Sequence, residues 1–184
     1  ANAYSNLGGI YKQIGKLEEA ERSTLKAIEL NPGLAEAYSN LGNILNEQGK
    51  IEEAEISYRK AIEIKPDYAN AYFNLFRHYE EINNIEKLEE SLKEFSDIDN
   101  IKNEIFLFKA RTNFRDNKNK NSKKLIDCVS NEWIEQSNND KKIKFWSYKA
   151  FIEDKIGNYD LAYSSFIKSQ EDSFYERFNK NKYL

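Results

Sequence analysis

The stretch Ala35 to Tyr68, AEAYSNLGNILNEQGKIEEAEISYRKAIEIKPDY, decides the fold. It is the clearest copy of a 34-residue unit whose first copy occupies residues 1–34. It holds two apolar segments, separated by residues 47–50 and closed by Pro66, and in each segment the apolar residues recur on one helical face. A helix–turn–helix unit of this kind cannot bury both stripes alone, so it must stack on neighbours. The pattern predicts an all-α solenoid of stacked helix pairs.

The two copies share small residues where paired helices would touch. Gly8 and Ala20 of the first copy correspond to Gly42 and Ala54 of the second. Proline lacks the amide donor that a continuing helix needs, so proline is expected to end each second helix. The residues predicted to pack the repeats are Tyr4, Leu7, Gly8, Ala20, Pro32, Tyr38, Leu41, Gly42, Ala54, Tyr58, Ala61, Pro66, Trp146, Ala150 and Ala162.

This pattern resembles the tetratricopeptide repeat (TPR), whose signature is a large residue, Leu-Gly, Tyr, then Ala, an aromatic residue, Ala and Pro. The resemblance implies a right-handed α-α superhelix that acts as a protein–protein interaction scaffold. It also implies that an extended peptide or partner segment binds in the concave groove. The regular first copies, followed by Asn/Lys/Phe-rich copies, also look like the N-terminal TPR arms of bacterial sulfotransferases or O-GlcNAc-transferase-like proteins. The alternative function is therefore the substrate-recruiting arm of a larger transferase.

The period continues beyond the second copy but becomes irregular. We expect repeats at about 69–102, 103–142 and 143–176, giving about five helix pairs in one solenoid domain, the last two irregular. Phe76 and Phe95 stand where small residues are expected, so the regular stacking should distort there. Residues 135–140 look like an insertion of about six residues. Residues 172–184 are expected to form a partial helix that caps the end.

Composition favours a binding module over other classes. A net charge of -3 argues against nucleic acid as the partner, because nucleic acid rewards a basic face. No apolar run is long enough to predict a membrane span, and the single Cys128 favours the cytoplasm. The first residue already lies in a repeat and Met is lacking, so we expect a piece of a longer protein. No catalytic, metal-ligand or cofactor motif is found in the sequence, so no enzyme activity is predicted for this chain.

Three asparagines, Asn6, Asn40 and Asn74, occupy the sixth position of consecutive repeats. In the TPR family this position faces the groove, and the series resembles the asparagine ladder of the O-GlcNAc transferases, which is associated with holding a peptide backbone. The alternative is that these residues are solvated or helix-capping. The predicted partner-binding residues are Asn6, Lys12, Ser39, Asn40, Asn43, Asn70, Asn74 and Arg77.

Two single residues and one further interaction complete the predictions. His78, the only histidine, is interpreted as structural or surface-exposed, since no second ligand accompanies it. Cys128 is expected to be buried on a second helix, as a small apolar residue. Self-association through exposed end repeats is a further possibility, because end repeats leave apolar faces uncovered.

Overall fold

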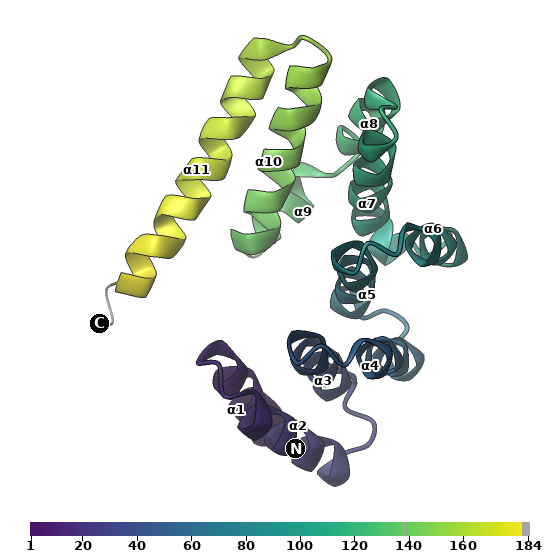
Figure 1. Ribbon diagram of the computed structural model, residues 1–184, viewed down its shortest axis with the longest axis vertical. Helices are drawn as coiled ribbons and strands as arrows, with labels where there is room; N and C mark the ends of the chain where they lie inside the picture. The colour runs from purple at the N-terminus through teal and green to yellow at the C-terminus, as the bar shows by residue number, and fades with distance from the viewer. Residues whose placement is uncertain (138, 182–184) are drawn as a thin grey trace. The chain divides into compact units, whose positions relative to one another are not determined.

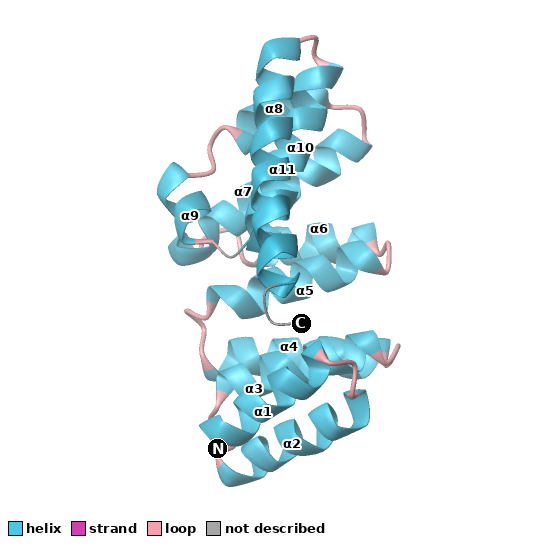
Figure 2. Cartoon of the chain, turned by 90° about the vertical axis from the view of Figure 1, so that its left-hand side faces the viewer, coloured by secondary structure: helices cyan, strands magenta, loops and turns pink. Residues whose placement is uncertain are grey.

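The computed structural model describes residues 1–137 and 139–181, with side chains described for 1–137 and 141–170. The described residues form helices and connecting turns, and no strand occurs among them (Figure 2). The chain divides into two compact units, residues 1–95 and residues 96–184. The architecture is the predicted all-α solenoid, and the two units are described separately below.

The N-terminal unit (residues 1–95) contains three helix pairs (Figure 1). The first helix of each pair packs on the second helix of its own pair, and α1 and α3 also pack on the first helix of the next pair. Each proline follows directly after the C-cap residue of a second helix, as predicted. The helices are α1 (Asn2–Gln13), α2 (Leu17–Leu30), α3 (Ala35–Glu47), α4 (Ile51–Ile64), α5 (Ala69–Glu81) and α6 (Ile85–Glu94).

The turn inside every helix pair has the same geometry. Its central residue has a positive φ, a conformation that only glycine adopts freely and asparagine tolerates. The residue after it donates its backbone N–H five residues back, and the central residue itself donates three residues back, which closes the preceding helix. The central residues are Gly15, Gly49, Asn83, Asn117 and Gly157. They place all pairs in one register, with 34 residues between the first four and 40 before Gly157.

The core of the N-terminal unit depends on close approach of paired helices. A Cβ at Gly42 would lie 2.5–2.9 Å from three ring atoms of Tyr58, and Tyr58 is completely buried. A Cβ at Gly8 would lie 2.2 Å from the hydroxyl of Thr24. The small residues at these positions are therefore required by packing, as the sequence predicts.

The third pair departs from the first two. Helix α6 has ten residues where α2 and α4 have fourteen, and it ends before Phe95. The Phe95 ring packs edge-on against Tyr72, with centroids 4.9 Å apart, and lies 6.4 Å from Phe76. Phe95 stands at the position where the first two copies have alanine. The distortion predicted from the large residues is observed, and the first unit ends here.

The C-terminal unit (residues 96–184) contains irregular helix pairs. The residues of the predicted insertion overlap a short helix, and the last pair begins at Asn139 rather than at 143. As far as Asn181, the predicted capping segment simply continues the last helix, and residues 182–184 lie outside the described residues. The elements are η1 (Asp99–Ile101), α7 (Lys102–Arg115), α8 (Asn119–Ile126), α9 (Asn131–Gln136), α10 (Asn139–Lys155) and α11 (Tyr159–Asn181).

One residue predicted to pack the repeats is more exposed than its equivalent, and the predicted burial of Cys128 is wrong. Tyr4 is 43% exposed, although the equivalent Tyr72 is 1% exposed. The difference follows from the facing residue, because Phe95 covers Tyr72 while the first copy has only Ala27 at that position. Cys128 is exposed because α8 ends at Ile126, and the thiol then lies in the following turn.

Candidate functional site

The first helices of the N-terminal unit form a polar surface, here called the first-helix face. Helices α1, α3 and α5 lie side by side, so that equivalent positions of consecutive repeats are neighbours. The Nδ2 of Asn40 donates to the hydroxyl of Ser5 at 3.1 Å. The Nδ2 of Asn74 donates to the hydroxyl of Ser39 at 3.0 Å. We call this pair of equivalent bonds the Asn–Ser ladder.

The Asn–Ser ladder changes the role of one predicted binding residue. Ser39 is 2% exposed and its hydroxyl accepts from Asn74, so its side chain is part of the scaffold and not of the open surface. The reason is its position, since it faces the next first helix. Asn40 and Asn74 are half-buried, whereas Asn6 and Asn70 are exposed. The structure therefore brings two of the three asparagines into the ladder.

A second network on this face joins two repeats. Asn43 accepts from the guanidinium of Arg77 at 3.1 Å and from the hydroxyl of Tyr58 at 3.0 Å. The guanidinium is also 3.5 Å from the carboxylate of Glu81. Burial raises the pKa of Tyr58 well above its usual value, so the hydroxyl keeps its proton and remains a donor. Asn43 and Arg77, both predicted groove residues, are therefore linked to each other.

A third network involves the buried histidine. Asn46 donates to Glu81 at 3.0 Å, which turns its Oδ1 toward Nδ1 of His78 at 2.7 Å. Because the Oδ1 of Asn46 is an acceptor, Nδ1 of His78 must carry the proton and act as the donor. His78 is 1% exposed, and burial lowers its pKa below the usual value. Its Nε2 has no hydrogen-bond partner among the described residues, so the structural interpretation of His78 fits its surroundings better than a surface one.

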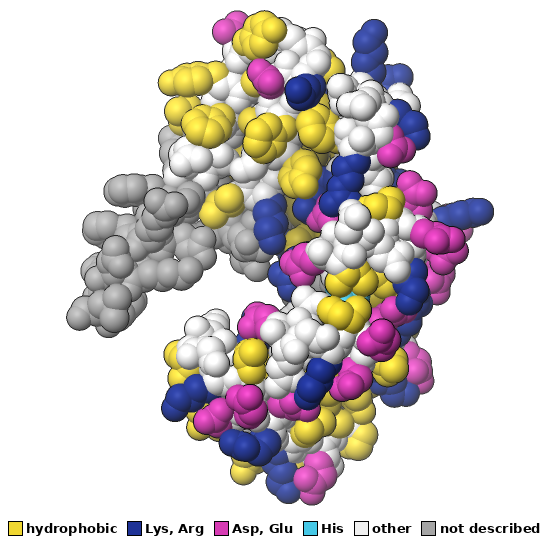
Figure 3. Space-filling model, viewed as in Figure 1, with side chains coloured by type: hydrophobic (Ala, Val, Ile, Leu, Met, Phe, Trp, Pro, Cys, Tyr) yellow, Lys and Arg dark blue, Asp and Glu magenta, His cyan; other side chains and the backbone are white. Residues whose placement is uncertain are grey.

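The charges of the first-helix face are paired with each other. Lys12 lies 2.9 Å from Glu47 of the next repeat, an ion pair between equivalent surfaces of α1 and α3. Figure 3 shows acidic and basic side chains interspersed over this unit rather than gathered by sign. Lys12 is therefore already neutralised locally, and the face offers no concentrated charge to a ligand.

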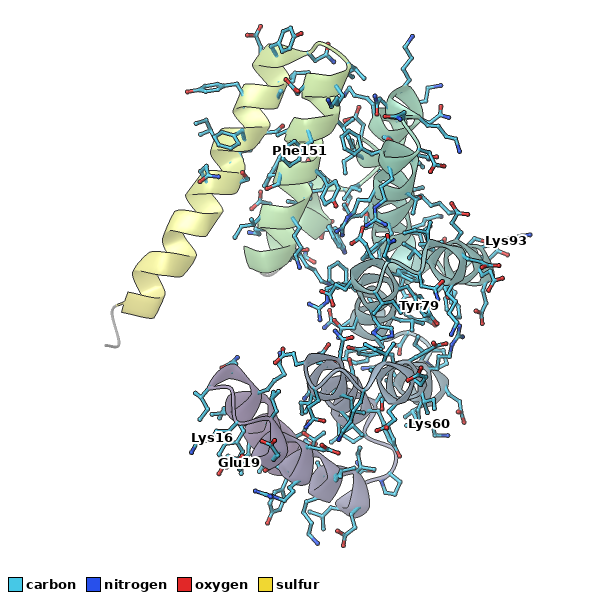
Figure 4. The ribbon with its side chains drawn as sticks, in the orientation of Figure 1. Lys16, Glu19, Lys60, Tyr79, Lys93 and Phe151 are labelled. Atoms are coloured by element: carbon cyan, nitrogen blue, oxygen red, sulfur yellow. The ribbon has the colours of Figure 1, made fainter. Side chains whose placement is uncertain are left out.

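The second helices contribute a carboxylate that joins two repeats. Glu55 on α4 accepts from the Tyr79 hydroxyl at 2.8 Å and from Lys87 at 2.7 Å (Tyr79 is labelled in Figure 4). Burial opposes the charge of Glu55, but the bonds from Lys87 and Tyr79 outweigh it and lower the pKa of Glu55. Sequence reasoning missed this group, because a glutamate in a helical charge pattern normally indicates a solvated face. The sequence feature that could have indicated the role of Glu55 is Tyr79, one repeat later, whose hydroxyl donates to it.

The C-terminal unit contains buried charges that the sequence did not indicate. Glu104 is 1% exposed and accepts from Nε1 of Trp133 at 3.0 Å, and burial raises the pKa of its carboxyl. Glu153 is completely buried and lies 2.7 Å from Nζ of Lys123. These groups link neighbouring helices and lie outside the predicted binding surface.

The described part of the chain contains neither a metal-binding cluster nor a membrane-spanning helix. Within it, His, Cys, Asp and Glu side chains nowhere gather in threes as they would around a metal ion. In the same residues, no helix combines the length and apolar character that crossing a membrane requires.

The architecture is that of a helical-repeat solenoid. The sequence profile described as "Tetratricopeptide repeat" matches residues 1–34 and 35–68, the same two copies that the sequence shows. Comparison with curated proteins gives no match. Residues 1–68 are therefore two adjacent copies of the tetratricopeptide repeat.

Solved structures show the same fold at low sequence identity. The chain is similar to one in the APC/C hetero-tetramer Cut9-Hcn1, with 17% identity, a TM-score of 0.77 and coverage of 93% of this chain. It spans only 33% of that chain. It also resembles Pseudomonas aeruginosa pilF, with 21% identity, a TM-score of 0.72 and coverage of 93% and 75% of the two chains. A thermophilic TPR protein of Thermus thermophilus, TTC0263, has 15% identity, a TM-score of 0.67 and coverage of 100% and 99%.

These similarities establish the fold. The likeness to transferase arms stays a prediction, because the matching profile describes the repeat and not any domain beyond it. The cytoplasmic location likewise stays a prediction.

Proposed function

We propose that the chain is a non-catalytic binding module and that the first-helix face of the N-terminal unit holds the backbone of an extended peptide. The observation that carries this proposal is the Asn–Ser ladder. Each carboxamide has two N–H donors and an acceptor oxygen, and the ladder uses one N–H. The second N–H and the Oδ1 of Asn40 and Asn74 are left to pair with a peptide unit, whatever its side chain.

The ladder also supports the proposal through orientation. A free surface asparagine would lose rotamer freedom on binding, at a cost of about 0.5–1.5 kcal/mol for each side chain. Asn40 and Asn74 are already held by Ser5 and Ser39, so much of that cost falls on folding instead. Binding by pre-oriented amides favours recognition of main chain over recognition of particular side chains.

The paired charges define the chemistry of the expected peptide. Lys12 is bound to Glu47, and Arg77 to Asn43 and Glu81, so a peptide carboxylate would have to displace an existing partner. A clamp for a C-terminal carboxylate is therefore disfavoured, and a polar, weakly charged extended segment fits best. Adjacent helices pack about 8–10 Å apart. Three first helices therefore span roughly 20 Å between the outer axes, which about six extended residues can cross.

The proposal can be tested with a random peptide library, because recognition of the peptide main chain does not require a particular sequence. Peptides of about ten residues, enough to cross the face, would be selected on the 184-residue chain, and their affinities measured by calorimetry. We expect the Asn40→Ala/Asn74→Ala variant to bind the selected peptides at least about tenfold more weakly, equivalent to about 1.4 kcal/mol.

A matched control uses asparagines outside the face. The Asn119→Ala/Asn121→Ala variant removes two amides from α8 and should bind with the affinity of the parent chain. Equal affinities for the parent chain and the ladder variant, with both folded by circular dichroism, would refute the proposed role of the ladder.

A further inference from the structure

The C-terminal unit contains a basic hollow at the junction between two of its helix pairs, here called the lysine hollow. It has a volume of about 470 Å³ and is lined by residues 117–121, which form the turn before α8 and the start of that helix, and by Lys155 and Ile156 at the end of α10. Figure 3 shows basic side chains over the end of the α7–α8 pair. Three of the lining residues are lysines, three are asparagines, and none of them carries a carboxylate.

Two of the three lysines in the hollow have no compensating charge. Lys118 is bound to Asp116, with Nζ 2.8 Å from the carboxylate. The side chains of Lys120 and Lys155 are exposed, and their ammonium groups form no ion pair or hydrogen bond with the described residues. The lysine hollow therefore combines two uncompensated positive charges with the neutral N–H donors of the asparagine amides.

The same positions of the N-terminal unit do not carry positive charge. Asn117 and Gly157 are the turn residues of the two pairs and set the register for the comparison. Three residues after the turn residue, at the position of Lys120, the N-terminal unit has Glu18, Glu52 and Glu86. Two residues before it, at the position of Lys155, the N-terminal unit has Gln13, Glu47 and Glu81. The charge at this junction is therefore the reverse of that in the regular repeats.

The reversal at Lys120 is not explained by the stability of the fold. A carboxylate in the first turn of a helix is stabilised by the helix dipole, whereas an ammonium group there is destabilised. Helices α2, α4 and α6 have glutamate in the first turn, and α8 has no acidic residue there. Lys120 is exposed, so packing does not offset this cost. A residue that opposes the local preference without a packing gain is typical of a functional site.

The chemistry of the hollow fits a phosphate group better than a carboxylate. A phosphate ester carries a charge of about −1.5 to −2 at pH 7 and has three strong acceptor oxygens. A carboxylate carries a single charge on two oxygens, so it cannot compensate both lysines. We propose that the lysine hollow binds a phosphate group, with Lys120 and Lys155 as the charged partners and Asn119 and Asn121 as neutral donors. Either a free phosphate anion or a phosphate ester presents this group, and neither requires the first-helix face.

A titration with inorganic phosphate, followed by the backbone amide signals in nuclear magnetic resonance spectra, tests the proposal. The 184-residue chain would be titrated in a phosphate-free buffer at constant ionic strength, since exposed charges are screened by salt. We expect the signals of residues 118–121 and 155–157 to shift and to reach saturation. The Lys120→Ala/Lys155→Ala variant should bind phosphate at least about tenfold more weakly.

A matched control removes the same charge from the other unit. Lys16 and Lys93, labelled in Figure 4, are exposed and have no ion-pair partner among the described residues. The Lys16→Ala/Lys93→Ala variant should therefore bind phosphate with the affinity of the parent chain. Circular dichroism would verify that both double variants remain folded. Equal affinities for the parent chain and Lys120→Ala/Lys155→Ala would overturn the proposal, because phosphate would then bind elsewhere or only through the net charge.

Two further titrations define the ligand. Acetate supplies a carboxylate and should bind more weakly than phosphate; acetate binding as tightly as phosphate would overturn the assignment to a phosphate group. A short phosphoserine peptide, blocked at both ends, supplies the phosphate ester. Tighter binding of this peptide than of inorganic phosphate would identify a phosphorylated partner as the source of the group, and the opposite order would identify a free anion.

Discussion

The contact between Gly42 and Tyr58 leads to a quantitative prediction. In Gly42→Ala the new methyl group would lie 2.5–2.9 Å from three ring atoms of Tyr58. Favourable carbon–carbon contacts lie at about 3.5–4.0 Å, so the ring would have to retreat by roughly 1 Å. It cannot do so freely, because it is completely buried and its hydroxyl is bound to Asn43.

Opposing effects set the size of the change. Alanine in a helix interior is favoured over glycine by about 1 kcal/mol. Overpacking costs about 1–3 kcal/mol, and weakening the bond to Asn43 adds about 1 kcal/mol. The net expectation is a loss of about 1–3 kcal/mol in the free energy of unfolding.

Gly9→Ala supplies the matched control one position along the equivalent helix. A Cβ at Gly9 meets no atom within 4 Å, so this variant should gain about 0.5–1 kcal/mol from helix propensity alone. Urea unfolding followed by circular dichroism compares the two midpoints. If Gly42→Ala and Gly9→Ala both raise the urea midpoint, Tyr58 does not press on α3 and the reasoning is refuted. A Tyr58→Leu background should reduce the cost of Gly42→Ala, since the two sites are coupled through one contact.

Three further predictions concern single groups. Burial lowers the pKa of His78 below its value in the unfolded chain, so the free energy of unfolding should be highest above about pH 6.5 and should fall as the pH drops through the folded pKa. Urea midpoints of the parent chain measured from about pH 7.5 to 5 should show this fall. An equal fall of the midpoint in His78→Gln would contradict the role of His78. Glu55→Gln should lower the free energy of unfolding by about 1–3 kcal/mol, because Tyr79 and Lys87 lose a charged acceptor; Glu29→Gln, at an exposed pair with Lys26, should cost at most about 0.5 kcal/mol, and equal midpoints would refute the difference. Gly49→Ala should destabilise by about 1–2 kcal/mol through its positive φ alone, since its Cβ would meet nothing within 4 Å; Gly49→Asn should cost less, and thermal melts that rank the two in the opposite order would contradict the account.

Local features of the fold could be predicted from the sequence because they depend on residues within one repeat. Gly42 and Tyr58 lie in the same helix pair, and the turn residue Gly49 closes the helix that precedes it. Their roles follow from residue size and backbone conformation. The large residue at Phe95, which indicated a departure from regular stacking, lies directly after the shortened α6.

The contacts between repeats could be predicted only in part. The asparagines stand out by their spacing, but their serine partners depend on the register between neighbouring first helices, so the sequence placed Ser39 on the open surface. Tyr4 matches the repeat pattern and is nevertheless exposed, because its burial depends on the residue that faces it. The burial of Glu104 and Glu153 depends on the irregular packing of the second unit, where residue types no longer repeat with a fixed period.

The side-chain amide resonances of Asn40 and Asn74 test the central claim most directly. Nuclear magnetic resonance spectra of the 184-residue chain would be recorded with and without a peptide selected from the random library. The account predicts that both amide signals shift on binding, while those of Asn119 and Asn121 stay in place. Binding of the peptide with no change at Asn40 and Asn74 would contradict the account, because the peptide would then be held elsewhere than on the first-helix face.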